Sequence, residues 1–185
     1  MNKSRMKMAR KSVKVWIASF FLLTGAFGTS FAAPPSGQYP VAPVFSAVTL
    51  DAKSVGSAKL AGKPFIINFF ASWCPPCRAE IPDMVSLQNL YAAKGFTFIG
   101  VAVSDKEATI RAFAKDNHIT YPVVMGDDKL VAAFGRYVEG GIQAIPTSIV
   151  VNSSGRITQV ITGGRSKEAF ESIIVDLLRK PGTTK

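Results

Sequence analysis

Residues that bind metals through sulfur or imidazole are scarce in this sequence. Its 185 residues include only two cysteines, Cys74 and Cys77, and one histidine, His118. A structural zinc site takes four ligands, so the cysteines would need two more, and His118 follows a predicted helix end where a surface role is more ordinary. Internal repeats and low-complexity tracts are also absent. We therefore expect one ordinary domain with neither a metal site nor a cofactor.

Outside the N-terminus the sequence also lacks a basic cluster. The net charge is +10, yet six of the 22 lysines and arginines and none of the 12 acids lie within residues 1–14. The rest of the chain has 16 basic residues against 12 acids, a net charge of +4. These charges are scattered and are not interleaved with aromatic residues, as a nucleic-acid surface would require. We expect no nucleic-acid partner.

The N-terminus has the pattern of an export signal. Basic residues are followed by an apolar run over residues 15–31, which ends in the small-X-small sequence Ser30-Phe31-Ala32. This pattern predicts a secretory signal peptide over residues 1–32. An uncleaved N-terminal anchor is the alternative, because the run is near the shortest length that crosses a bilayer, and only then would the protein contact a membrane. No cysteine lies near the cleavage site, which excludes a lipoprotein.

The rest of the chain is long enough for one domain. Residues 33–43 are rich in Pro, Ser and Gly, and they predict a disordered or extended linker before a domain over residues 44–181. A hairpin is predicted within residues 44–57. Ser104 and Glu107 form a capping-box pattern for a helix that carries Ile110 and Phe113. Further strands are predicted at residues 63–72, 96–103, 121–125, 147–151 and 156–162, and further helices at residues 78–93, at 129–134 and after Ser166.

Cys74 and Cys77 lie between a buried strand and a helix, which is the setting of a redox-active dithiol. Inside a regular helix their β-carbons would be about 5 to 6 Å apart, whereas a disulfide needs about 3.8 Å. Cys74 should therefore be the N-cap, with Pro75 and Pro76 in the first turn. This arrangement predicts that Cys74 is exposed and attacks as the nucleophile, while Cys77 is shielded and resolves the mixed disulfide.

The two prolines also bear on the redox potential of the pair. The positive end of a helix favours a thiolate at Cys74, but neither Pro75 nor Pro76 has an N–H to donate to it. We therefore expect a reducing rather than a strongly oxidising pair. A structural disulfide is one alternative, although closing so short a loop contributes only about 2 kcal/mol. A Cu(I) site is another, since thiolates bind that soft ion, although no third ligand lies nearby in the sequence.

The residues around the cysteines resemble a known family. The motif runs from Asn68 to Pro82 as Asn-Phe-Phe-Ala-Ser-Trp-Cys-Pro-Pro-Cys-Arg-Ala-Glu-Ile-Pro, and Ile145-Pro146-Thr147 precedes a later strand. From about residue 44 to residue 179, the chain is similar to the thioredoxin superfamily, in its TlpA/ResA-like exported branch. The resemblance implies a thioredoxin-like α/β fold, in which helices flank a central mixed β-sheet and a helix-strand insertion occupies residues 105–134.

The resemblance also implies roles for single residues. It implies that the Ile145–Pro146 bond is cis and lies beside the cysteines, with the Ile145 backbone pairing with the substrate chain. Trp73, Ile145 and Pro146 are thus candidate substrate-binding residues, although packing beside the disulfide is the more ordinary role for Trp73. Asn68 stands where thioredoxin itself has a buried acid. Glu80 is the candidate for proton exchange with the shielded thiol, and a solvated helix glutamate is an equal alternative.

The expected function is that of an exported thiol-disulfide oxidoreductase, in the periplasm or on the outer face of the cytoplasmic membrane. It would reduce a disulfide of a partner protein through the Cys74 and Cys77 dithiol, which is oxidised in turn to the redox disulfide Cys74–Cys77. By resemblance, the client is apocytochrome c before haem attachment or a copper-site protein of the respiratory chain, and a membrane dithiol carrier supplies the electrons. A Cu(I)-handling metallochaperone module and a general disulfide oxidant remain the alternatives.

Overall fold

The structure is a computed structural model that describes residues 39–179. The predicted signal peptide, the first six residues of the predicted linker and the last two of the predicted domain lie outside this range. Among the described residues, no helix is both long and apolar enough to cross a membrane.

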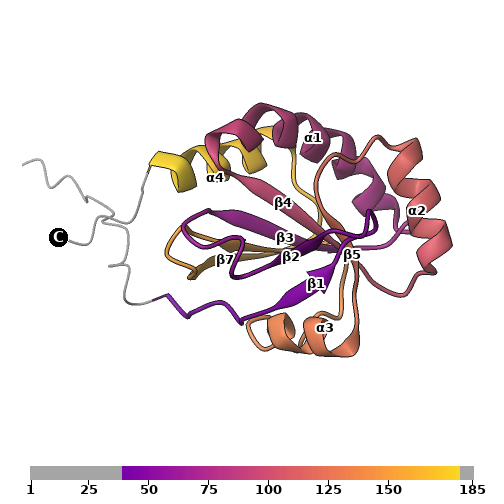
Figure 1. Cartoon of the computed structure of the whole chain (residues 1–185), viewed down its shortest axis with the longest axis horizontal. Coiled ribbons are helices and arrows are strands. Elements are labelled where there is room, and N and C mark those ends of the chain that lie inside the picture. The colour runs from indigo at the N-terminus through magenta and orange to yellow at the C-terminus, as the bar shows by residue number, and fades with distance from the viewer. Residues whose placement is uncertain (1–38, 180–185) are drawn as a thin grey trace, which may run out of the picture. The chain divides into compact units, whose positions relative to one another are not determined.

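A five-stranded mixed sheet forms the centre of the domain (Figure 1). Its strands lie in the order β5-β4-β3-β6-β7, with β3 parallel to β4, β4 parallel to β5, and the other neighbours antiparallel. The predicted thioredoxin-like fold with a central mixed sheet is confirmed. The bounds are β3 (Phe65–Phe70), β4 (Thr97–Ala102), β5 (Val123–Met125), β6 (Thr147–Val151) and β7 (Ile157–Thr162).

Helices cover both faces of the sheet, and the alternation of side chains along β3 shows why every residue of that strand except Asn68 is apolar. Ile66 and Phe70 point to one face, which is covered by α1 (Pro75–Tyr91), α2 (Glu107–Asp116) and α4 (Lys167–Arg179). Phe65, Ile67 and Phe69 point to the other, which is covered by α3 (Asp128–Gly135). A strand buried on both faces has no solvent side on which polar residues would be favoured.

A β-hairpin precedes the sheet, as predicted. It consists of β1 (Ser46–Val48) and β2 (Ser54–Gly56), which pair antiparallel. A bridge between Thr49 and Val124 joins the hairpin to β5. Through this bridge, the hairpin covers part of the edge that β5 would otherwise expose.

A short 3-10 helix, η2 (Ala92–Lys94), follows α1.

The predicted linker ends earlier than expected. The Ala42 N–H donates to the Gly155 carbonyl at 2.9 Å, and the Ile157 N–H donates to the Pro40 carbonyl at 2.9 Å. We call residues 39–42 the strap, because they pair with the turn after β6 and with the first residue of β7. The composition of these residues indicated a linker. The hydrogen bond at Pro40 uses only its carbonyl, however, so the missing N–H of proline does not prevent pairing at this edge.

The predicted capping box is wrong. The N-cap of α2 is Lys106, which makes no side-chain capping bond. Ser104 has a φ of 54°, and the Asp105 carboxylate accepts from the Ser72 N–H at 2.7 Å. The polar residues before α2 therefore hold the loop in front of the cysteines instead of capping their own helix.

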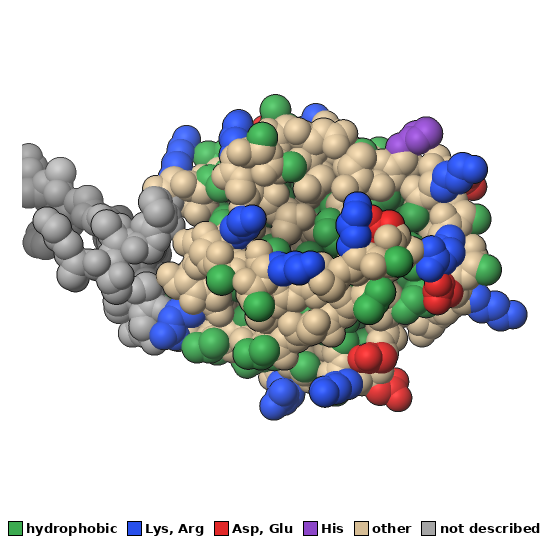
Figure 2. All heavy atoms as spheres, in the orientation of Figure 1, with side chains coloured by type: hydrophobic (Ala, Val, Ile, Leu, Met, Phe, Trp, Pro, Cys, Tyr) green, Lys and Arg blue, Asp and Glu red, His purple; other side chains and the backbone are tan. Residues whose placement is uncertain are grey.

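The basic residues are dispersed over the face of the molecule drawn in Figure 2, where lysine and arginine side chains are separated by apolar and uncharged surface and the acidic ones lie mostly on the right. This face carries no continuous basic patch of the kind that follows a nucleic-acid backbone.

Candidate redox site

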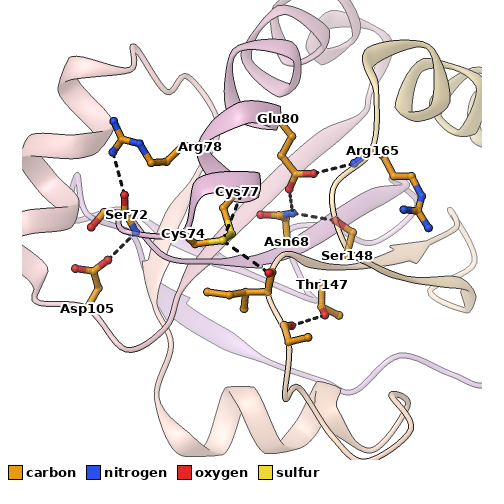
Figure 3. Close-up of a disulfide and its surroundings, with 12 residues drawn as sticks. Asn68, Ser72, Cys74, Cys77, Arg78, Glu80, Asp105, Thr147, Ser148 and Arg165 are labelled. Atoms are coloured by element: carbon orange, nitrogen blue, oxygen red, sulfur yellow. Dashed lines mark hydrogen bonds between the residues drawn. A yellow bond between two sulfur atoms is a disulfide. The ribbon is translucent and has the colours of Figure 1, made fainter.

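The two cysteines lie at the N-terminus of α1, where they form a disulfide (Figure 3). Cys74 is the N-cap of α1, as the spacing predicts, and Pro75 and Pro76 are the first two residues of the helix. The Cys77 N–H donates to the Cys74 sulfur at 3.3 Å. A sulfur at the N-cap replaces the hydroxyl or carboxylate oxygen that usually accepts this bond.

The prediction that Cys74 is exposed is wrong for the disulfide form. Cys74 is only 3% exposed and Cys77 is fully buried. The Ile145 carbonyl oxygen lies 3.7 Å from the Cys74 sulfur and helps to cover it. The spacing of a motif places a residue on a helix, but it does not show which loop from elsewhere in the chain packs over that residue.

The loop before Cys74 is fixed by contacts from two other segments. The Arg78 guanidinium donates to the Ser72 carbonyl at 2.9 Å, while the Ser72 N–H donates to Asp105, so both main-chain polar groups of Ser72 are paired. The Trp73 indole N–H donates to the Ser104 carbonyl at 3.1 Å. Trp73 is nevertheless 60% exposed, so more than half of its surface is open to solvent.

The second loop of the site precedes β6. The Ile145–Pro146 peptide bond is cis, and the Thr147 hydroxyl donates to the Ala144 carbonyl at 2.7 Å. The Gly163 N–H donates to the Pro146 carbonyl at 2.8 Å. This last bond extends the ladder between β6 and β7 by one step beyond the pair of Thr147 and Thr162.

Glu80 is buried behind the disulfide, so the alternative of a solvated glutamate is wrong. Its side chain projects from α1 toward the sheet, and the residue is 3% exposed. One carboxylate oxygen accepts from the Asn68 amide at 2.8 Å, and the other accepts from the Arg165 main-chain N–H at 3.2 Å. Burial raises the pKa of Glu80 to about 7, although both hydrogen bonds and the charge of Arg165 oppose this change.

Asn68 connects this acid to the sheet. The residue lies on β3 between Ile66 and Phe70, on the face that α1 covers, and is 1% exposed. Its amide nitrogen also donates to the Ser148 hydroxyl on β6 at 2.9 Å. A neutral amide can donate to a carboxylate, which an acid at this position could do only in its protonated form.

Sequence reasoning missed several polar residues of the site. Ser148 could have been suspected, because a lone polar side chain at an inward position of an apolar strand needs a partner. Arg165 gave no signal, since its contribution is a main-chain N–H that any residue except proline would supply. Ser104 gave a signal that pointed to a different role, that of a helix cap, and Asp105 beside it gave none.

Metal ligands do not gather at this site. Within residues 39–179, no group of three or more His, Cys, Asp and Glu residues is placed to hold a metal ion. His118 follows the end of α2.

Comparison with known proteins identifies the family. The sequence model of the Redoxin family matches residues 35–178. The chain belongs to the Redoxin family. Over 125 residues this Redoxin is 32% identical to the thiol-disulfide oxidoreductase ResA of Halalkalibacterium halodurans, and the match covers 68% of each chain.

Solved structures agree with this assignment. A thioredoxin-family thiol:disulfide interchange protein from Chlorobium tepidum is 48% identical, with a TM-score of 0.74, and the match covers 76% of this chain and 97% of that one. StoA from Bacillus subtilis is 27% identical, with a TM-score of 0.59, and covers 72% of this chain and 97% of its own. The protein is thus a ResA-like thiol-disulfide oxidoreductase with a Cys-X-X-Cys pair.

Proposed function

We propose that this Redoxin works as an exported reductase of protein disulfides. The direction of the reaction is inferred from the number of hydrogen-bond donors around the Cys74 sulfur. Its sulfur accepts from one N–H, that of Cys77 at 3.3 Å, while Pro75 and Pro76 have none to give. A thiolate with few donors is less stabilised, so the reduced pair gives up its electrons more readily.

The proposed reaction is two successive thiol-disulfide exchanges. The Cys74 thiolate attacks one sulfur of the client disulfide, the client S–S bond breaks, and the second client sulfur leaves as a thiolate. The Cys77 thiolate then attacks Cys74, which forms the intramolecular disulfide and releases the first client sulfur. Two electrons pass from the protein to the client, and each client thiolate takes up a proton.

Glu80 is the proposed acceptor for the proton of Cys77. Cys77 is fully buried, so its thiol needs an internal base before it can attack. Glu80 lies one turn further along α1, and its pKa of about 7 lets it take and return a proton near neutral pH. Replacing Glu80 by Gln should therefore shift the pH profile of disulfide exchange, and an unchanged profile would remove this role.

Trp73, Ile145 and Pro146 are the proposed contacts with the client. The Ile145 carbonyl oxygen lies 3.7 Å from the Cys74 sulfur, so a chain attached to Cys74 would pass beside the main chain of this loop. The exposed Trp73 indole is held in place by Ser104. It offers an apolar surface that costs little conformational entropy on binding.

The proposed location and partners follow from the leader and from the resemblance. A signal peptide over residues 1–32 would deliver the protein to the periplasm or to the outer face of the cytoplasmic membrane. Disulfides form readily in such compartments, so a membrane dithiol carrier would have to keep the pair reduced. The proposed client is apocytochrome c before haem attachment or a protein that receives respiratory copper.

Two alternatives have less support. A Cu(I)-handling module would use the reduced cysteines as ligands, but no third His, Cys, Asp or Glu joins them in residues 39–179. A general disulfide oxidant would need a strongly stabilised thiolate at Cys74, which the two prolines do not favour. Copper stoichiometry of the reduced protein, measured beside insulin reduction, separates the first alternative from the reductase.

Trapping of the mixed disulfide tests the proposed function. A Cys77→Ala variant cannot resolve the intermediate, so clients should stay attached to Cys74 and be identified by mass spectrometry after export. Cys74→Ala is the matched control and should capture nothing. Equal recovery with both variants, or no captured protein with Cys77→Ala, would contradict the proposal.

A further inference from the structure

The turn between β7 and α4 contacts both halves of the redox site. The Gly163 N–H donates to the Pro146 carbonyl at 2.8 Å, and two residues later the Arg165 N–H donates to the Glu80 carboxylate at 3.2 Å. Gly163 has a φ of 84°, a conformation that side-chain-bearing residues rarely adopt. We call residues 163–165 the bridging turn, because two of its amides reach two different parts of the site.

The bridging turn also packs closely on α1. A β-carbon added at Gly164 would lie 3.6 Å from Glu80 Oε2 and 3.6 Å from the Pro76 carbonyl oxygen. The other oxygen of Glu80 is held from the sheet by Asn68, which donates to Ser148 as well. Both carboxylate oxygens are therefore linked to the start of β6, one through the bridging turn and one through Asn68.

We propose that the main-chain amide of Arg165 is a positioning element, through which the charge of Glu80 and the conformation of the Ile145–Pro146 loop influence each other. The inference rests on the proposed function in one respect, that clients dock on this loop. The connection is made of two hydrogen bonds on one short turn. It thus needs no movement of the sheet or of the helices.

Protonation of Glu80 disturbs the two contacts unequally. A neutral carboxyl group has an O–H, which must face an acceptor. Asn68 can turn its amide oxygen toward that O–H, but the Arg165 N–H can only donate. The hydrogen bond from Arg165 to the neutral group is weaker than the bond to the carboxylate, so the bridging turn is freer to move when Glu80 carries a proton.

The groups that titrate or carry charge around Glu80 are few among the described residues. Arg165 faces it from the bridging turn, and its positive charge favours the carboxylate. Tyr121 faces it from the segment before β5, and burial together with the charge of Glu80 raises the pKa of its phenol, so this group stays neutral. Cys77 lies one turn away on α1 and has no proton in the disulfide. The coupling should therefore follow the titration of Glu80 alone.

Nuclear magnetic resonance of the oxidised full-length protein in detergent tests this inference without any client. The observables are the Glu80 carboxyl shift, the Gly163 amide shift and the scalar coupling across the hydrogen bond from Gly163 to Pro146. In the wild type, all three should change between about pH 5 and about pH 9, on either side of the Glu80 pKa of about 7. In Glu80→Gln, the Gly163 shift and the coupling should stay constant.

A pair of variants separates the amide from the side chain. Arg165→Pro removes the N–H, so the pKa of Glu80 should rise by about one unit and Gly163 should no longer follow it. Arg165→Ala keeps the N–H and should retain the response of Gly163. If Arg165→Pro does not fold, the coupling measured in the wild type and in Glu80→Gln still decides the question.

Two results would overturn the inference. In one, Glu80 titrates in the wild type while the scalar coupling from Gly163 to Pro146 is constant. In the other, the Gly163 amide responds to pH equally in Arg165→Pro and Arg165→Ala, as the electric field of the Glu80 charge acting through space would produce. Neither result bears on whether Cys77→Ala captures clients, so failure here is distinct from failure of the reductase proposal.

Discussion

At the scale of single residues, Glu80 and Asn68 determine the proton chemistry of the site. A carboxylate that is 3% exposed is costly to keep charged, and one amide and one main-chain N–H compensate only in part. The result is an acid that titrates near neutral pH instead of near its ordinary value. The sequence predicted the candidate, but it did not distinguish a buried acid from a solvated one, since helix periodicity leaves Glu80 beside the apolar stripe.

The raised pKa of Glu80 makes the stability of the protein depend on pH. Because the pKa in the folded state, about 7, exceeds the unfolded value of 4.5, the folded protein holds the proton more tightly between these values. Stability from this group is fully present below about pH 4.5 and is lost as the pH rises through about 7. Urea unfolding should show a decline of about 3 kcal/mol over this range. Glu80→Gln should lack this decline, and equal slopes in both proteins would contradict the assignment.

Replacing Asn68 by Asp should create a pair of carboxyl groups that share one proton. The amide nitrogen lies 2.8 Å from Glu80 Oε1, so two carboxylates there would repel each other, and the second proton would leave only at high pH. The free energy of unfolding should fall more steeply above neutral pH than in the wild type. The double variant Asn68→Asp with Glu80→Gln has one acid and should lose this extra slope; if it retains it, the pair is not the cause.

At the scale of elements, the hydrogen bonding at the N-terminus of α1 is determined by the N–H groups that Pro75 and Pro76 lack. Two prolines are compatible with a first turn, because its N–H groups have no partner within the helix. They also leave the Cys77 N–H as the donor for the Cys74 sulfur. The N-cap position of Cys74 was predictable from the spacing of the motif. Its burial was not, because the covering loop is 71 residues further along the chain.

Replacing Pro76 by Ala should make the pair more oxidising. The variant restores an N–H at the second position of α1, from which it can donate to the Cys74 thiolate. The pKa of Cys74 should fall and the reduction potential should rise, as measured by thiolate absorbance and by equilibration with glutathione. Pro82→Ala changes a proline inside the same helix, far from the sulfur along the chain, and should leave the potential unchanged. A shift of equal size in both variants would contradict the role of the missing donor.

At the scale of the whole molecule, the mixed sheet brings together loops that are distant in the sequence. The antiparallel pairing of β3 with β6 places Thr147 opposite Phe69, so the start of β6 meets the end of β3 and the cysteines beyond it. Periodicity predicted most strands and helices to within a few residues. The strap was missed, because its few hydrogen bonds depend on the exposed edge of a strand more than a hundred residues away.

Removal of the strap should destabilise the domain but leave the redox site intact. Besides its two main-chain bonds, it accepts from Arg156 at the Tyr39 carbonyl and from Tyr137 at the Val41 carbonyl. A chain that begins at residue 44 should lose about 2 to 4 kcal/mol of unfolding free energy relative to one that begins at residue 39. The two chains should have the same reduction potential. The strap lies beyond the C-terminal end of β6, whereas Thr147 and the redox site lie at its N-terminal end. Unequal potentials would show that the strap affects the site.

The reduction potential of the Cys74–Cys77 pair is the most direct test of the proposal that this Redoxin donates electrons to its clients. Equilibration of the wild-type protein with defined ratios of reduced and oxidised glutathione, followed by quantification of the free thiols, gives this value. The donor set of Cys74 predicts a potential nearer to about −270 mV, as in thioredoxin, than to about −120 mV, as in a strong oxidant. A potential near the oxidising end would contradict the reductase proposal and favour the general disulfide oxidant.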